Sequence, residues 1–124
     1  MIKVVINGYL GQMGQVIEKQ IMDKDNMELI GGIDKNPNSY KGETKVCKNI
    51  SDFDNICDVI IDFSHPEALD DFLNYAKANK IALVIGTTGY EEKEFEKLRE
   101  ASKEIPIFYS ANMSLGINLL LSLV

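Results

Sequence analysis

Hydrophobic residues along the chain follow two patterns that predict strands and helices in alternation. Short, nearly continuous apolar runs predict strands at 2–7, 27–34, 57–62, 81–85 and 106–109. Runs such as 57–62 and 81–85 are typical of strands covered on both faces, which favours a parallel sheet. Between the strands, apolar residues recur every three or four positions, as on helices that lie against a sheet. The predicted helical stripes are Met13, Val16, Ile17 and Ile21; Leu69, Phe72, Leu73 and Ala76; and Phe95, Leu98, Ala101 and Ser102.

Residues 35–50 interrupt this pattern with a polar segment that includes Pro37 and Gly42. We interpret the segment as a loop with a short strand near 45–47, followed by a helical turn after Ser51. The alternation as a whole predicts an α/β fold, a doubly wound parallel sheet with helices on both faces.

The first strand leads into a turn that contains Gly8, Gly11 and Gly14, and a helical pattern follows. Asp34 ends the second apolar run, twenty positions after Gly14. Strand, glycine turn, helix, strand and terminal carboxylate form the layout of a Rossmann-like dinucleotide-binding unit. The spacing is G-x-x-G-x-x-G rather than G-x-G-x-x-G, so an ordinary glycine turn is the alternative. The flanking elements favour nucleotide binding.

Each part of this layout has an expected role. Gly8 would allow the tight turn, and Gly11 would let the backbone approach a pyrophosphate. Gly14 would let the helix and the strand pack closely. The pyrophosphate would bind the free N–H groups at the helix start. Asp34 would accept hydrogen bonds from the hydroxyls of the adenosine ribose.

Parallel sheets bind ligands beyond the carboxyl ends of their strands, so we expect the strand ends to carry function. These candidates are Gly8, Asp34, 62–64, 86–89 and 109–112. Ser64 with Glu67 and Thr88 with Glu91 match the capping box that begins a helix, and either hydroxyl could also touch a ligand. The segment 86–89, Gly-Thr-Thr-Gly, would permit close approach of a flat ring.

Two further strand-end residues are candidates. Asn112 could bond a carboxamide or a loop carbonyl. His65 could be a general acid or base. We favour a structural role instead, in which His65 is the residue before Pro66 at a helix start.

Composition narrows the function classes. The 124 residues suit one domain, and a net charge of −6 without a basic run argues against nucleic acid or an anionic membrane as partner. Cys47 and Cys57 with a single histidine are too few for a structural zinc site, so we expect reduced thiols and no metal. No signal peptide or membrane-spanning run is visible, and we expect a cytoplasmic protein.

Four motifs in order resemble the N-terminal half of 4-hydroxy-tetrahydrodipicolinate reductase (dihydrodipicolinate reductase). They lie at 4–14, 62–67, 85–89 and 110–118 and span nearly the whole chain. The resemblance implies reduction of a cyclic dicarboxylate intermediate on the diaminopimelate route to lysine, with hydride taken from NADH or NADPH.

The resemblance also implies a set of cofactor-binding residues. The pyrophosphate turn would be lined by Gly8, Gly11, Met13 and Gly14, and Asp34 would hold the ribose. Phe63, Gly86 and Thr88 would lie along the nicotinamide, with Thr88 also facing the substrate. The nicotinamide side would be closed by Ala111, Asn112 and Met113. The predicted cofactor site further includes Gln12, Lys35, Ser64 and Thr87.

The chain departs from the family at the position that often carries Arg and helps to hold the 2′-phosphate of NADPH. Gln12 stands there and supplies no charge. Asp34 would repel that phosphate, although Lys35 could compensate in part. We therefore expect NADH to be favoured, or little preference.

The family has a second domain that carries its proton donor, its substrate clamp and its tetramer interface. We expect residues 1–112 to form the dinucleotide-binding domain and 113–124 a hinge helix leading toward such a substrate and oligomerisation domain. Catalytic residues are not expected in this chain. Alone it should bind dinucleotide without turnover, and it could dimerise.

Two alternatives are a dinucleotide-sensing module without chemistry and another dehydrogenase, such as an aspartate or hydroxyacid dehydrogenase. The Gly-Thr-Thr-Gly and Asn-Met-Ser-Leu-Gly segments argue against the second.

Overall fold

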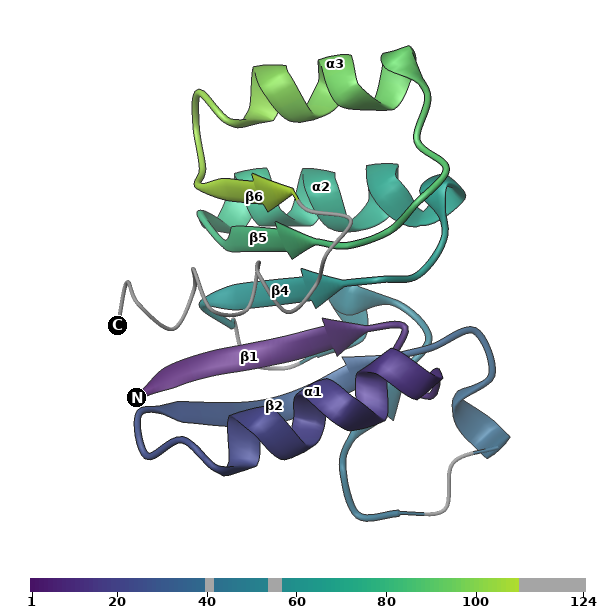
Figure 1. Ribbon diagram of the computed structural model, residues 1–124, viewed down its shortest axis with the longest axis vertical. Helices are drawn as coiled ribbons and strands as arrows, with labels where there is room; N and C mark the ends of the chain where they lie inside the picture. The colour runs from purple at the N-terminus through teal and green to yellow at the C-terminus, as the bar shows by residue number, and fades with distance from the viewer. Residues whose placement is uncertain (40–41, 54–56, 110–124) are drawn as a thin grey trace.

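A parallel sheet forms the centre of the molecule, and all its strands point the same way (Figure 1). The computed structural model describes residues 1–39, 42–53 and 57–109, and within these the sheet has six strands in the order β3-β2-β1-β4-β5-β6. The strands are β1 (Ile2–Asn7), β2 (Met27–Ile33), β3 (Val46–Cys47), β4 (Val59–Asp62), β5 (Ala82–Ile85) and β6 (Ile107–Tyr109). The predicted strands are confirmed, although four are shorter than expected by one or two residues.

Helices cover both faces of the sheet, as the sequence predicts. They are α1 (Gln12–Met22), α2 (Leu69–Asn79) and α3 (Glu92–Ala101), with short 3-10 turns η1 (Pro37–Ser39), η2 (Ile50–Asp52) and η3 (Pro66–Ala68). Helix α1 lies across β1 and β2, whereas α2 and α3 lie on the opposite face (Figure 1). Among the described helices, none is long and apolar enough to cross a membrane.

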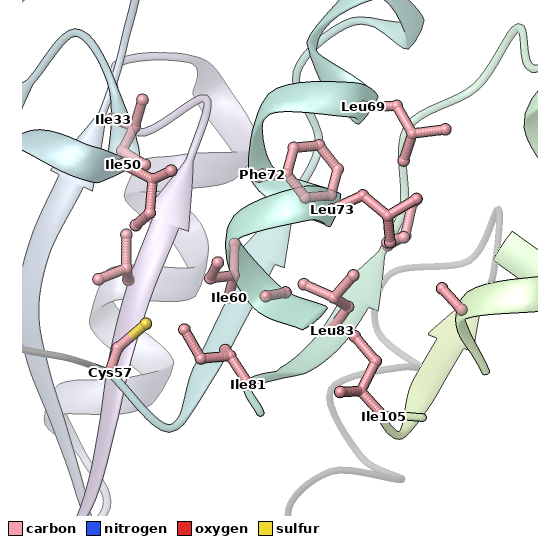
Figure 2. Close-up of a cluster of buried hydrophobic side chains, with 14 of the residues drawn as sticks. Ile33, Ile50, Cys57, Ile60, Leu69, Phe72, Leu73, Ile81, Leu83 and Ile105 are labelled. Carbon is pink, nitrogen blue, oxygen red and sulfur yellow. The ribbon is translucent and has the colours of Figure 1, made fainter. Parts of the chain in front are cut away.

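The apolar strands contribute to two cores because alternate residues of a strand point to opposite faces. Val4 and Ile6 of β1 pack with Ile17 and Ile21 of α1 on one face. On the other face, a larger cluster joins the sheet to α2, η2 and the end of α3 (Figure 2). Its labelled members are Ile33, Ile50, Cys57, Ile60, Leu69, Phe72, Leu73, Ile81, Leu83 and Ile105. Burial on both faces fixes the strands, and therefore fixes the positions of their carboxyl ends.

The stripe predicted for α2 is confirmed, since all four of its residues are buried. The stripe predicted for α1 is partly wrong, because Met13 and Val16 are 41% and 48% exposed. The buried line is Gly14, Ile17 and Ile21 instead. Gly14 lies in close contact with the preceding turn, so its side of the helix faces inward, and Met13 and Val16 face outward.

The stripe predicted for α3 also needs one correction. Leu98 and Ala101 are buried and Phe95 is half-buried, but Ser102 is exposed. Ser102 is the C-cap residue, and its hydroxyl donates to the carbonyl of Arg99 at 2.6 Å. The buried line of α3 begins with Glu94, a residue that the hydrophobic pattern alone does not select.

Candidate functional site

The two central strands, β1 and β4, define the point at which the strand order reverses. After β1 the chain enters α1 on one face, and after β4 it enters α2 on the other face (Figure 1). Doubly wound sheets bind ligands in the crevice at this point, outside the carboxyl ends of the strands. A hollow of about 460 Å³ opens there. This switch-point hollow is lined by residues that include Asn7, Gly8, Asp34, Lys35, Ser64 and His65.

Gly8 makes the tight turn that the sequence predicts. Its φ is +85°, a region that residues with a Cβ avoid. The backbone N–H groups of Gly8 and Tyr9 donate to the carbonyl of Ile33 at 2.8 and 3.1 Å. A Cβ at Gly8 would lie 3.1 Å from the carbonyl oxygen of Phe63. The turn is therefore held between the ends of β2 and β4.

Gly14 allows a close approach, but its partner is the turn rather than the strand itself. A Cβ at this position would lie 2.1 Å from the carbonyl oxygen of Tyr9, far inside any allowed contact. The side-chain amide of Gln15 also donates to that oxygen at 3.3 Å. The first turn of α1 therefore rests directly on the glycine turn.

The amino end of α1 is left open in the described structure. Gly11 is the N-cap residue, no side chain caps the helix there, and the first turn carries no acidic residue. Gln12 and Met13 are exposed beside it. Uncapped N–H groups and the helix dipole suit an anion such as a pyrophosphate. Gly11 itself has a φ of −74°, and a Cβ there would make only an ordinary contact, so its predicted role toward a ligand stays a prediction.

Asp34 follows β2 directly and lies beside the glycine turn. Its carboxylate accepts hydrogen bonds from the backbone N–H of Leu10 at 3.1 Å and of Asn36 at 3.3 Å. These two bonds fix the carboxylate at the rim of the switch-point hollow and leave it acceptor capacity for a ligand hydroxyl. Lys35 is exposed and lines the same hollow.

A buried carboxyl group occupies the centre of the site. Asp62, the last residue of β4, is fully buried and accepts hydrogen bonds from Asn7, Ser64 and Thr87. Burial raises the pKa of the Asp62 carboxyl, and the bonds from Ser64, Thr87 and Asn7 oppose that rise. Asp62 is among the strand ends expected to carry function, but neither Asp62 nor Asn7 is among the predicted cofactor-binding residues. The sequence does mark both residues, because each is a polar residue at the carboxyl end of an otherwise apolar strand.

Both predicted capping boxes are wrong. The N-cap residue of η3 is His65 and that of α3 is Glu91, so neither Ser64 nor Thr88 caps a helix. The Ser64 hydroxyl donates to Asp62 at 2.6 Å instead. The Ser64 hydroxyl therefore bonds to the carboxyl group at the end of β4 instead of capping the helical turn that follows.

The remaining predicted residues lie near the same edge of the sheet, apart from a group outside the described residues. Phe63 and Gly86 are half-buried where β4 and β5 end, and Thr88 is exposed after them. The N–H of Gly86 donates to the backbone carbonyl of Asp62 at 2.7 Å, which holds the two strand ends together. The residues predicted to close the nicotinamide side, Ala111, Asn112 and Met113, are not described.

His65 lines the switch-point hollow and directly precedes Pro66 at the start of η3, in agreement with the interpretation we favour. The hollow also includes Lys48, which sequence reasoning did not select. Within the described ranges, no group of three or more His, Cys, Asp or Glu residues could hold a metal ion. A glycine turn with a positive φ, an open helix start and a carboxylate after β2 together fit a dinucleotide.

Comparison with known proteins agrees with this geometry. The family model of the N-terminus of dihydrodipicolinate reductase matches residues 2–113. A 4-hydroxy-tetrahydrodipicolinate reductase of Clostridium novyi (strain NT) is 41% identical over 97% of this chain and 47% of its own length. The same-named protein of Caldanaerobacter subterraneus subsp. tengcongensis is 44% identical over 100% of this chain and 49% of its own length.

Solved structures show the same fold. Dipicolinate-bound dihydrodipicolinate reductase from Paenisporosarcina sp. TG-14 superposes with a TM-score of 0.69 at 26% identity, over 83% of this chain and 42% of that one. Homoserine dehydrogenase of S. aureus gives a TM-score of 0.68 at 16% identity, over 89% of this chain and 32% of that one, and supports the fold alone. The chain spans about half the length of the curated relatives that it matches. It belongs to the dihydrodipicolinate reductase family and corresponds to the N-terminal part of that family's proteins.

Proposed function

We propose that this chain is the cofactor-binding half of an NAD(P)H-dependent reductase that converts 4-hydroxy-tetrahydrodipicolinate to tetrahydrodipicolinate. The reaction belongs to the diaminopimelate route to lysine. The observation that carries the proposal is that Gly8 and Asp34 line the switch-point hollow, while the glycine turn that begins at Gly8 leads directly into the open start of α1. The relatives that share 41% and 44% of the sequence carry the name of this enzyme.

In the proposed complex, the pyrophosphate binds the N–H groups of 11–14 at the start of α1. The hydroxyls of the adenosine ribose donate to Asp34, with Lys35 beside them. The nicotinamide lies along Phe63, Ser64, Gly86 and Thr88, and Thr87, between the last two, donates its buried hydroxyl to Asp62. We also assign Ala111, Asn112 and Met113 to the nicotinamide side.

When bound, the cofactor supplies the hydride for the reduction. The residues of this chain bind the cofactor, orient it and bring Thr88 toward the substrate. We place no proton donor in this chain, and expect it in a substrate and oligomerisation domain reached through the hinge helix 113–124. The dinucleotide-binding domain is then 1–112. A full-length enzyme of this kind would be a cytoplasmic homotetramer, and the isolated chain would not turn over substrate.

We propose that the preference between NADH and NADPH follows from the charges of the side chains beside the adenosine ribose. Asp34 disfavours a 2′-phosphate, Lys35 offsets this in part, and Gln12 supplies no charge. NADH is therefore favoured, or neither cofactor strongly. Gln12→Arg should increase affinity for NADPH relative to NADH by roughly tenfold, because a charge-assisted hydrogen bond contributes about 1.5–3 kcal/mol. An unchanged affinity ratio would place the 2′-phosphate away from position 12.

The proposal is tested by calorimetric titration of the chain with NADH and with NADPH. Binding should be strongly weakened in Asp34→Ala and unchanged in Asp25→Ala. Asp25 is a matched control because it is an exposed carboxylate that precedes β2, at the opposite end of the same strand. Absence of binding by a folded wild-type chain, or equal losses in the two variants, would contradict the proposed cofactor site.

The activity itself requires a second experiment. Fusion of this chain to the C-terminal half of the Clostridium novyi reductase should give NADH oxidation that depends on 4-hydroxy-tetrahydrodipicolinate. Hydride donor, proton donor and oriented substrate must come together for turnover. A fusion that binds NADH and substrate but never oxidises NADH would support a sensing module instead.

A further inference from the structure

The buried carboxyl of Asp62 bonds to Ser64 in its own segment and to two distant segments of the chain, at Asn7 and at Thr87. Asp62 lies between β1 and β5 in the sheet, in register with Asn7 on one side and Ile85 on the other. Its Oδ1 accepts from Asn7 Nδ2 at 2.8 Å, Ser64 Oγ at 2.6 Å and Ser64 N at 3.3 Å. Its Oδ2 accepts from Thr87 Oγ1 at 2.7 Å. We call Asn7, Asp62, Ser64 and Thr87 the Asp62 network.

The segments that meet in the Asp62 network are the walls of the proposed cofactor site. Asn7 directly precedes Gly8, which makes the turn assigned to the pyrophosphate. Thr87 lies between Gly86 and Thr88, the residues assigned to the nicotinamide. Three of its four members are buried, since Asp62, Thr87 and Asn7 are 0%, 3% and 6% exposed, and Ser64 is half-buried. A buried polar cluster whose members satisfy one another is rigid, because breaking one bond leaves a desolvated group unpaired.

We propose that Asp62 is a positioning residue that sets the distance between the pyrophosphate turn and the nicotinamide segment. The inference rests on the proposed function and extends it to a residue that touches no part of the cofactor. Two bonds join Asp62 to the nicotinamide segment: the Gly86 N–H donates to its backbone carbonyl at 2.7 Å, and the Thr87 hydroxyl donates to its Oδ2 at 2.7 Å. Loss of the Thr87 bond removes the side-chain restraint on the part of the segment that follows Gly86, while the Gly8 turn and Asp34 keep their own hydrogen bonds to Ile33, Leu10 and Asn36.

The test compares two ligands that differ only at the nicotinamide end. ADP-ribose carries the adenosine, the pyrophosphate and the second ribose, whereas NADH adds the dihydronicotinamide. Thr87→Val removes the hydroxyl donor at nearly constant volume, and Thr87→Ser keeps it. Calorimetry on the full chain gives the dissociation constant of each ligand for the wild type and both variants.

We expect Thr87→Val to weaken NADH by at least about tenfold and ADP-ribose by no more than about twofold, since a lost positioning bond acts on one end of the ligand. Thr87→Ser should behave like the wild type with both ligands. A merely structural role predicts equal losses for the two ligands, because partial unfolding removes both sites. Equal losses, no loss, or a Thr87→Ser variant that matches Thr87→Val would each overturn the inference.

Two other outcomes are distinguishable. If the wild type binds NADH no more tightly than ADP-ribose, the nicotinamide is not held by this chain, and the inference fails while dinucleotide binding stands. If it binds neither ligand, the proposed function fails as well.

Should Thr87→Val not fold, Asp62→Asn takes its place. The carboxamide oxygen can still accept from Asn7 and Ser64, and its NH2 group can donate to a reversed Thr87 hydroxyl. A smaller NADH-specific loss supports the inference, and equal losses for both ligands overturn it.

Discussion

Replacement of Gly8 by alanine should destabilise the fold more than the same change at Gly89. Both residues have a positive φ, +85° and +87°, so both substitutions incur a similar backbone cost of about 1–2 kcal/mol. Only Gly8 adds a contact with fixed backbone: its Cβ would lie 3.1 Å from the Phe63 carbonyl oxygen and 3.4 Å from Ser64 Cα. The Cβ of Gly89→Ala would meet only Pro66, at an ordinary 3.6 Å.

Overpacking against a fixed neighbour costs about 1–3 kcal/mol. The gain from a less flexible unfolded chain is common to both substitutions and cancels in their difference. We therefore expect the free energy of unfolding of Gly8→Ala to lie about 1–3 kcal/mol below that of Gly89→Ala. Urea denaturation followed by circular dichroism, with linear extrapolation to water, measures both values. A difference below about 0.5 kcal/mol, or a larger loss at Gly89, would refute the argument that the turn is pressed against β4.

Three further predictions concern other parts of the fold. Gly14→Ala should lower the free energy of unfolding by about 2 kcal/mol, because its methyl would overlap the Tyr9 carbonyl, although alanine is the better helix former; a neutral effect in urea denaturation would contradict that contact. Burial raises the pKa of the Cys57 thiol to about 12, so a disulfide reagent should modify the half-buried Cys47 first and Cys57 only after denaturant is added; equal rates in native buffer would disprove this. Burial also raises the pKa of Asp62 in the folded state, so its stabilising contribution is complete below the unfolded pKa of about 3.9 and is lost as pH rises through the folded value. The stability of the wild type relative to Asp62→Asn should therefore fall above about pH 4, and a rise over that range would reverse the assigned direction.

The sheet could be predicted from sequence because its strands are covered on both faces and read as apolar runs, and the glycine turn because Gly8 has a conformation that few other residues adopt. The Asp62 network could not be predicted, since Asn7 and Asp62 are 55 positions apart and meet only through the strand order. Ser64 fits a local capping pattern, but its hydroxyl donates a hydrogen bond to the carboxyl of Asp62 instead. The outward turn of Val16 likewise depends on a contact elsewhere, at Gly14.

The two ends of the candidate site are held by separate sets of hydrogen bonds. Asp34 is fixed by Leu10 and Asn36 at the end of β2, whereas the Asp62 network joins β1, β4 and β5. Because neither set shares a side chain with the other, substitutions at the proposed ribose end would leave the proposed nicotinamide end undisturbed. Such a division would let a lineage exchange one cofactor for the other in small steps, each of which keeps the Asp62 network intact. It would also let a protein engineer vary 34–36 as an independent unit.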